Sequence, residues 1–279
     1  MLMAVTVVLN CGRCAPIARN NQLNKFGNRA ARLLLSAMHN IFGMKFIRKS
    51  DVFHIEESVL TYRMQALKMT FNKMRHFNWE LTENAELYGQ FDMPILRPVR
   101  EAAIGKLIPF NEASRCRNPQ ECWVHFYIDD YRFERVWNNY MKYLPMLRRF
   151  KGVITPDFSM YLDMPLPQQI ENCWRNRCLA YWLQEQGIHV LLSVGWSDAE
   201  SLKWAFDGIP ENSVLSVTTQ GCLRDHLCMQ AFLNGMHELV RRKHPLKIIV
   251  YGRFPTIWKE RFSVEIEIHP CYSEEKWSE

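Results

Sequence analysis

The sequence predicts an α/β protein built on a mostly parallel sheet, and two observations support this prediction. Between Trp123 and Gly252, apolar runs of strand length alternate with segments of helical periodicity, the pattern of right-handed crossover units. Five of these runs also end abruptly in polar residues, as strands do when they finish at a common edge. We favour an incomplete or distorted barrel slightly, and a doubly wound open sheet remains the alternative.

Charge divides the chain into two parts, a basic and largely helical segment at 1–84 and an α/β domain at 85–279. Residues 1–76 contain 12 Lys and Arg against 3 Asp and Glu, a net charge of +9, whereas residues 77–279 contain 23 against 26, a net of −3. Helical periodicity predicts basic helices at 20–49 and 56–76. Nucleic acid is the predicted partner of residues 1–76, with a membrane surface or a merely solvated helical face as alternatives.

The elements of the α/β domain follow from apolar spacing and from proline and glycine positions. Pro94 and Pro98 exclude a helix and predict an extended segment at 93–97, and the polar stretch 111–121 predicts a loop. The alternation then predicts strands at 124–128, 152–155, 188–194, 213–217 and 246–251, helices at 133–144, 167–186, 198–206 and 224–243, and a half-exposed edge strand at 264–268.

Two of these helices have further features. Pro145 is expected to interrupt the helix at 133–144. In the helix at 167–186, one apolar stripe is expected to face the sheet, and Arg175, Asn176 and Arg177 are expected on the opposite, polar face. No catalytic role is assigned to these three residues.

Composition excludes several classes of protein. With 48% hydrophobic and 13% aromatic residues the chain can bury a large core, which excludes a disordered protein. No apolar run approaches the roughly 18 residues that a membrane span needs. The opening MLMAVTVVLNC lacks a charged n-region and predicts a buried strand instead of a signal peptide.

Cysteine usage predicts a cytoplasmic protein. Nine cysteines spread along a long chain without a compact disulfide framework indicate a reducing compartment. Cys11 and Cys14 have the spacing of a metal knuckle, which Cys116 with Cys122, or Cys222 with His226, would have to complete. Small buried side chains are the alternative interpretation for these cysteines.

Carboxylates at the strand ends predict the reacting centre. The candidate catalytic residues are Asp129, Asp130, Asp157 and Asp198. Clustered oxygen ligands suit a divalent cation such as Mg²⁺ or Mn²⁺, and Asp129 and Asp157 are the candidate metal ligands. The alternative is structural: Asp198 and Asp130 are placed to cap helices, and Asp157 follows Pro156 in an expected turn.

Other strand-end residues are candidates for binding a substrate. Trp196 and Tyr251 offer aromatic rings, Gln220 and Gly221 precede the helix at 224–243, and Arg253 could clamp an anion. Packing of Trp196 and a rim ion pair of Arg253 are the alternatives. The predicted substrate is a phosphate-bearing nucleotide or nucleic acid, while a non-enzymatic ligand-binding or DNA-binding module remains open.

Common catalytic signatures do not narrow the reaction further. The sequence has no nucleophile elbow, Walker loop, dinucleotide glycine fingerprint or HExxH zinc motif. Whether the protein is an enzyme therefore depends on the strand-end carboxylates.

An ordered series of short motifs resembles a bacterial and phage family of unknown function, DUF4417. The series comprises YGQFDMPILRP at 88–98, LIPFNEA at 107–113, VHFYIDDYRFERVWN at 124–138, GVITPDFS at 152–159, WSD at 196–198, FDGIP at 206–210 and VYG at 250–252. The resemblance extends from about Tyr88 to Arg253 and implies a phage or bacterial origin, often on mobile elements, without an established activity. Residues 1–80 lie outside the resemblance.

Overall fold

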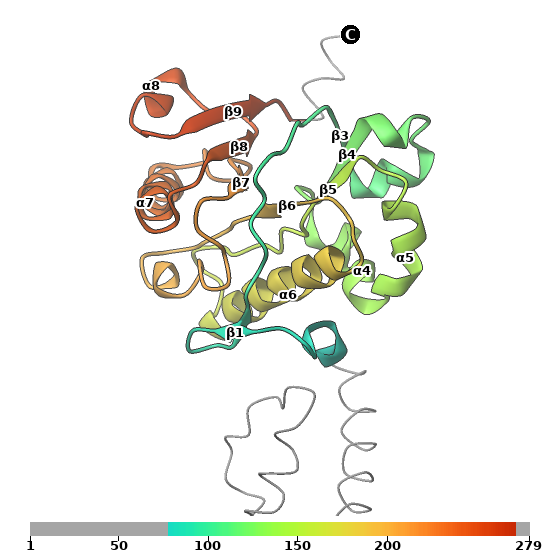
Figure 1. Cartoon of the computed structure of the whole chain (residues 1–279). Helices are drawn as coiled ribbons and strands as arrows, with labels where there is room; N and C mark the ends of the chain where they lie inside the picture. Colours follow the sequence, from blue (N-terminus) through green and yellow to red (C-terminus); the bar gives the residue numbers. More distant parts are fainter. Residues whose placement is uncertain (1–77, 272–279) are drawn as a thin grey trace, which may run out of the picture. The chain divides into compact units, whose positions relative to one another are not determined.

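The computed structural model describes residues 78–271, and the chain divides into two compact units, Met1–Asn84 and Ala85–Glu279. The described part of the first unit holds one 3-10 helix, η1 (Trp79–Thr82). The helices predicted at 20–49 and 56–76, and the strand predicted at the start of the chain, lie outside the described residues. The second unit contains the sheet (Figure 1).

The main sheet has seven strands, each parallel to the strand before it in the chain. In order they are β3 (Lys106–Pro109), β4 (Cys122–His125), β5 (Gly152–Ile154), β6 (Val190–Ser193), β7 (Val214–Thr218), β8 (Lys247–Tyr251) and β9 (Glu265–His269). This order never reverses, so the sheet lacks the switch point of a doubly wound fold.

The sheet curls into a half-barrel. At its carboxyl edge the ring centroids of His125 in β4 and Tyr251 in β8 lie only 4.5 Å apart, although three strands separate these two strands in the sheet. Such a contact requires both side chains to be on the concave face. The predicted α/β fold with a parallel, incomplete barrel is therefore confirmed.

The structure corrects the position of one predicted strand. Within 93–97, only β2 (Met93–Pro94) is a strand, and it pairs antiparallel with β1 (Leu87–Tyr88) in a separate small sheet. The main sheet instead begins with β3, for which the apolar spacing predicted no strand. Pro109 ends this edge strand, where the missing N–H of proline is tolerated.

The two long helices are confirmed as α6 (Leu166–Glu185) and α7 (His226–Lys243). The helix predicted at 133–144 is wrong as one element, because the backbone turns at Asn139 between α4 (Glu134–Asn138) and α5 (Tyr140–Leu147). The helix predicted at 198–206 is reduced to η5 (Ser201–Lys203) with flanking turns. Among the described residues, no helix combines the length and apolar character that crossing a membrane requires.

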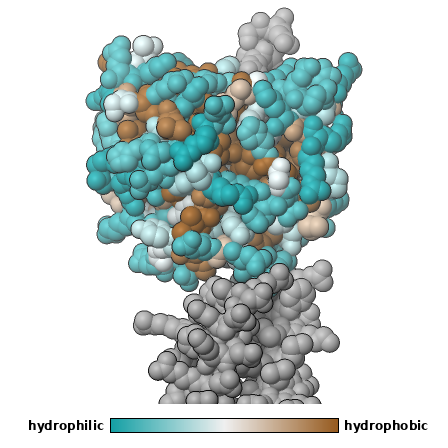
Figure 2. Space-filling model, viewed as in Figure 1, coloured by the Kyte–Doolittle hydropathy of each residue, from teal (hydrophilic) through white to brown (hydrophobic). Residues whose placement is uncertain are grey.

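Short helical turns fill most of the remaining connections. They are η2 (Phe110–Arg115), η3 (Pro119–Glu121), η4 (Asp130–Arg132) and α8 (Thr256–Lys259). In Figure 1, α7 and α8 lie beside strands β7 to β9, and α4 and α5 lie near β3 to β5. Figure 2 shows a mainly hydrophilic surface on the viewed face, with apolar side chains visible between the hydrophilic ones.

An extended segment, residues 95–105, passes the amino ends of the strands. Its Val99 carbonyl accepts a hydrogen bond from Val214 N at the start of β7 (2.7 Å), and its Ala103 carbonyl accepts one from Trp123 Nε1 near the start of β4 (3.2 Å). The segment therefore crosses the amino end of the half-barrel, and the carboxyl edge with the predicted site lies opposite.

Candidate functional site

Buried aromatic and hydroxyl groups fill the half-barrel just below the carboxyl edge. Tyr127 Oη donates a hydrogen bond to Ser216 Oγ (2.7 Å), and the Tyr127 ring stacks on Tyr251 with centroids 5.2 Å apart. Strand register puts Ser216 beside Ser193 on the same face of the sheet. The site therefore has a polar floor instead of the aliphatic layer of a simple barrel core.

His125 belongs to this floor and is held neutral. Complete burial lowers the pKa of His125 from 6.5 to about 3. Its Nδ1 accepts a hydrogen bond from Tyr127 N (3.2 Å), which assigns the ring proton to Nε2. Nε2 is buried without a hydrogen-bond partner. The histidine is thus an uncharged donor inside the half-barrel.

Asp157 lies above this floor, three residues after β5 ends. Burial raises its pKa from 3.8 to about 7, and the negative charge of Asp130 raises it further, while a hydrogen bond with Ser193 and the charge of Arg177 oppose the rise. Asp157 in turn raises the pKa of Tyr127 and of Cys222, after the larger effect of burial on each. A carboxyl group with this pKa can both give and take a proton near neutral pH.

Asp130 is the second carboxylate of the site. It accepts hydrogen bonds from Ser159 N (3.1 Å) and Ser159 Oγ (2.9 Å). Burial raises its pKa, and the Ser159 hydrogen bonds and the Arg175 guanidinium offset part of that rise. Ser159 therefore fixes the position of the carboxylate, and the charge of Arg175 favours its ionised form.

The other two predicted carboxylates have different environments. Asp129 is 65% exposed at its side chain and forms an ion pair with Arg132 Nε (3.1 Å). Asp198 is exposed, and its Oδ1 accepts a hydrogen bond from Ser201 N (3.0 Å), as in the capping alternative. Among residues 78–271, no group of three or more His, Cys, Asp or Glu side chains is placed to hold a metal ion.

A buried polar network behind Asp157 is the part of the site that the sequence analysis missed. Asn176 Nδ2 donates to Ser193 Oγ (2.9 Å) and to the Pro156 carbonyl (2.6 Å), and Asn176 Oδ1 accepts from Arg177. Ser193 Oγ also lies 3.0 Å from Thr155 Oγ1. A small hollow next to this network is lined by Asp157, Asn172, Asn176, Arg177 and Gly195, among others.

The prediction that residues 175–177 lie on the polar face of the helix is therefore wrong, because all three are buried. Arg177 is only 1% exposed, and its guanidinium donates to the carbonyls of Ala205 and Asp207. Helical spacing could have indicated this, because Asn176 and Arg177 lie three and four residues after Cys173, a member of the stripe expected to face the sheet.

The predicted aromatic ligands divide into two environments. Tyr251 lies in the floor beside Tyr127 and His125. Trp196 packs outward on α7: its Nε1 donates to the Ala231 carbonyl (3.1 Å), and its ring stacks on Phe232. These contacts satisfy the indole without a ligand.

The predicted phosphate-binding residues lie in two segments, the loop before α7 and the residues after β8. Gln220, Gly221 and Arg253 are exposed. The cap of α7 is already occupied, because the Asp225 side chain accepts a hydrogen bond from Cys228 N (2.9 Å). The negative charge of Asp225 disfavours an anion at that helix end, which leaves the loop at 218–221 and Arg253 as the available phosphate contacts.

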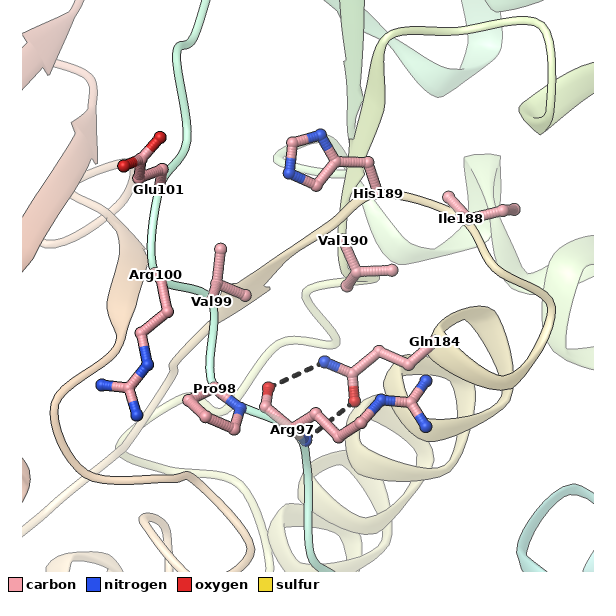
Figure 3. A pocket seen from close by; sticks show the side chains of 9 residues that line it. All are labelled: Arg97, Pro98, Val99, Arg100, Glu101, Gln184, Ile188, His189 and Val190. Carbon is pink, nitrogen blue, oxygen red and sulfur yellow. Dashed lines mark hydrogen bonds between the residues drawn. The ribbon is translucent and has the colours of Figure 1, made fainter.

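A cavity at the other end of the half-barrel contains none of the predicted site residues. It has a volume of about 480 Å³ and is lined by residues 97–101, Gln184 and residues 188–190. The Gln184 side chain accepts a hydrogen bond from Arg97 N and donates one to the Arg97 carbonyl, each 2.9 Å long. Figure 3 shows the two bonds between this amide and the Arg97 backbone. This hydrogen bonding attaches the extended segment to the end of α6.

Comparison with known proteins identifies the family. The chain is 36% identical over 153 residues to the Gene 1 protein of Mycobacterium phage D29, an alignment that covers 50% of this chain and 56% of that protein. It is 32% identical over 153 residues to the Gene 1 protein of Mycobacterium phage L5, covering 50% and 66%. The chain thus spans less than two thirds of either phage protein.

No solved structure matches the chain significantly. The profile of one family matches residues 85–269, which contain the whole half-barrel and its carboxyl edge. The chain belongs to that family, described as Domain of unknown function (DUF4417).

Proposed function

We propose that the carboxyl edge of the half-barrel is the active site of a divalent-cation-dependent enzyme that acts on a phosphate-bearing substrate, a nucleotide or a nucleic acid. The observation that supports this proposal is Asp157, a carboxyl group whose pKa is raised to about 7 beside the charge of Asp130. Perturbed titration at the edge where parallel strands end is typical of functional groups.

The chemistry of the pair favours a cation that is shared with the substrate. Asp130 and Asp157 repel each other when both are ionised, so a bound cation would relieve the repulsion and displace the proton from Asp157. Mg²⁺ commonly binds one or two protein carboxylates and takes its other ligands from water and substrate phosphates.

We leave Asp129 and Asp198 out of the proposed pair, because both are exposed and neither is among the groups that shift the pKa of Asp157. We also leave out Trp196. The loop at 218–221 and Arg253 are the proposed contacts for the phosphate, and the cation at Asp157 would polarise it and activate water.

Thermal unfolding of the full-length protein tests the proposal. Mg²⁺ or Mn²⁺ together with a nucleotide or short oligonucleotide should raise the Tm by about 5 °C at saturating ligand, because ligands stabilise the state they bind. Asp157→Asn should abolish the shift. The matched control is Asp163→Asn, which removes an exposed carboxylate from the loop after β5 and should leave the shift unchanged.

Two results would contradict the proposal. One is an unchanged Tm of the wild type with every combination of cation and phosphate compound. The other is an equal shift in wild type and Asp157→Asn, which would place the binding elsewhere. The affinity for the cation should also increase from about pH 6 to about pH 8, because binding requires Asp157 to lose its proton.

A second proposal concerns the partner. Residues 1–76 have a net charge of +9, and we propose that they bind nucleic acid, either to bring a substrate to the carboxyl edge or as a DNA-binding module without catalysis. This proposal depends on the charge of the sequence, because these residues lie outside the described part of the chain.

A further inference from the structure

Two thiols meet at the amino end of β4, the end of the strand opposite to the carboxyl edge. Cys116 Sγ and Cys122 Sγ are 3.8 Å apart. Cys116 is the C-cap of η2, and Cys122 is the first residue of β4. A disulfide requires the two sulfurs to approach to about 2.05 Å, so a movement of about 2 Å would join them.

The connection between β3 and β4 explains why these cysteines are close. Parallel strands need a crossover that returns to the amino end, and here residues 110–121 form it from the 3-10 turns η2 and η3 instead of an α-helix. Cys116 lies between these turns, and Cys122 begins the strand to which they return. The sulfur contact therefore joins the middle of an irregular crossover to its end.

The two thiols differ in access. Cys116 is half-buried, whereas Cys122 is only 3% exposed. Burial raises the pKa of Cys122 to about 11, and the neighbouring Cys116 raises it as well. Cys122 is thus a protonated, enclosed thiol, and Cys116 is the sulfur that a reagent from solution can reach.

We propose that Cys116 and Cys122 are a redox-sensitive pair that a small-molecule disulfide converts reversibly into an intramolecular disulfide. This inference is independent of the proposed enzymatic function. None of the residues assigned to the carboxyl edge takes part in it.

The reaction proceeds by two thiol–disulfide exchanges. The Cys116 thiolate attacks one sulfur of oxidised glutathione, which breaks the glutathione S–S bond and releases one glutathione thiolate. Cys122 loses its proton to water or base and attacks the Cys116 sulfur, which releases the second glutathione thiolate. In sum, two protein thiols and one glutathione disulfide become one protein disulfide and two glutathione thiols.

Peptide mapping of the full-length protein tests the pair. Reduced protein is incubated with oxidised glutathione, alkylated after denaturation and digested with trypsin without reductant. Cleavage after Arg115, Arg117 and Arg132 separates the two cysteines into peptides 116–117 and 118–132. We expect these two peptides to be recovered linked, and the link to disappear after dithiothreitol.

Variants and an internal control complete the experiment. Cys122→Ser should stop at the first exchange and retain a glutathione adduct on Cys116, and Cys116→Ser should leave Cys122 alkylated as a free thiol. The buried Cys173 and Cys178 should be alkylated in every sample. Oxidation should raise the wild-type Tm by roughly 5 °C, because a cross-link between residues 116 and 122 lowers the conformational entropy of the unfolded chain. Cys116→Ser should lack this increase.

The proposal is overturned if peptides 116–117 and 118–132 of the oxidised wild type are recovered only as separately alkylated species. It is equally overturned if either peptide is linked to a different cysteine. Neither result bears on cation or nucleotide binding, so the two proposals fail separately.

Discussion

At the scale of single residues, the proton on Asp157 links the candidate site to the stability of the fold. In the unfolded chain an Asp side chain has a pKa of 3.8, and in the structure that of Asp157 is about 7. Between these pH values the folded protein holds a proton that the unfolded chain has released. The resulting stabilisation is complete below about pH 3.8 and is lost as pH rises through about 7.

The variant Asp157→Asn should remove this pH dependence, because the amide remains neutral. At about pH 8 it should be more stable than wild type by up to about 4 kcal/mol, the upper limit for a pKa difference of roughly three units, and near pH 4 the two should differ little. Urea unfolding at several pH values measures both free energies. If the free energies of unfolding of the two proteins change in parallel with pH, the pKa of Asp157 is not raised in the folded protein.

The pKa of His125 shifts in the opposite direction to that of Asp157. Its effect on the pH dependence of stability must therefore be separated from the effect of Asp157. Its pKa is lowered to about 3, so its contribution is present above about pH 6.5 and is lost as pH falls. Both proteins in the comparison contain His125, and its effect therefore cancels in the difference between wild type and Asp157→Asn. Asp163→Asn should follow the wild-type profile, since Asp163 is exposed.

At the scale of elements, a substitution of Gly252, the glycine after β8, tests how closely the loops of the carboxyl edge pack against each other. Gly252 has φ +110°, and a Cβ at this position would lie 2.5 Å from Thr219 Oγ1. Gly252→Ala should therefore lower the free energy of unfolding by about 2–3 kcal/mol, because it strains the backbone and displaces the loop at 218–221. Chemical denaturation measures the loss.

Gly187→Ala is the matched control for this prediction. Gly187 also has a positive φ, +71°, but a Cβ there would have no atom within 4 Å. Gly187→Ala should lower the free energy of unfolding by about 1 kcal/mol, the penalty of the backbone conformation alone. Equal losses in the two variants would mean that the contact with Thr219 has no effect.

The elements also show which parts of the fold the sequence could predict. Strands β4 to β8 were predictable because each is a short apolar run that ends in polar residues. β3 was not, because it ends in Pro109, which is disfavoured within a ladder. The prediction that Pro145 interrupts a helix is wrong, because Pro145 lies inside α5. It is exposed there, so water can bond to the helix carbonyl that the missing proline N–H leaves unpaired.

The candidate site was predictable in position but only partly in composition. The convergence of the strand ends follows from their parallel direction, and in the structure the charge of Asp130 acts on Asp157. Helical spacing can indicate that Asn176 and Arg177 are buried on α6, but it does not predict their partners. These partners are Ser193 and the carbonyls of residues 205 and 207. The sequence also does not reveal which carboxylates accept hydrogen bonds from distant residues, as Asp130 does from Ser159.

At the scale of the whole molecule, charge is distributed unequally between the two parts of the chain. Residues 1–76 have a net charge of +9 and residues 77–279 a net charge of −3. A polyanion would therefore be attracted to the first part and repelled weakly by the second. The family match begins at residue 85, so the basic part lies outside it.

Nucleic-acid binding by residues 1–76 should consequently be tolerant of sequence and steeply dependent on salt. Each phosphate neutralised by Lys or Arg releases counterions, so the affinity should fall by about 10³-fold or more between about 50 and 200 mM salt if six or more phosphates are contacted. Gel-shift titrations at the two salt concentrations, with full-length protein and with a protein lacking residues 1–76, measure this. Circular dichroism of the shortened protein must first show a folded α/β domain. Equal binding by the two proteins would place the nucleic-acid contacts on the half-barrel, and no binding by either would remove nucleic acid as the partner.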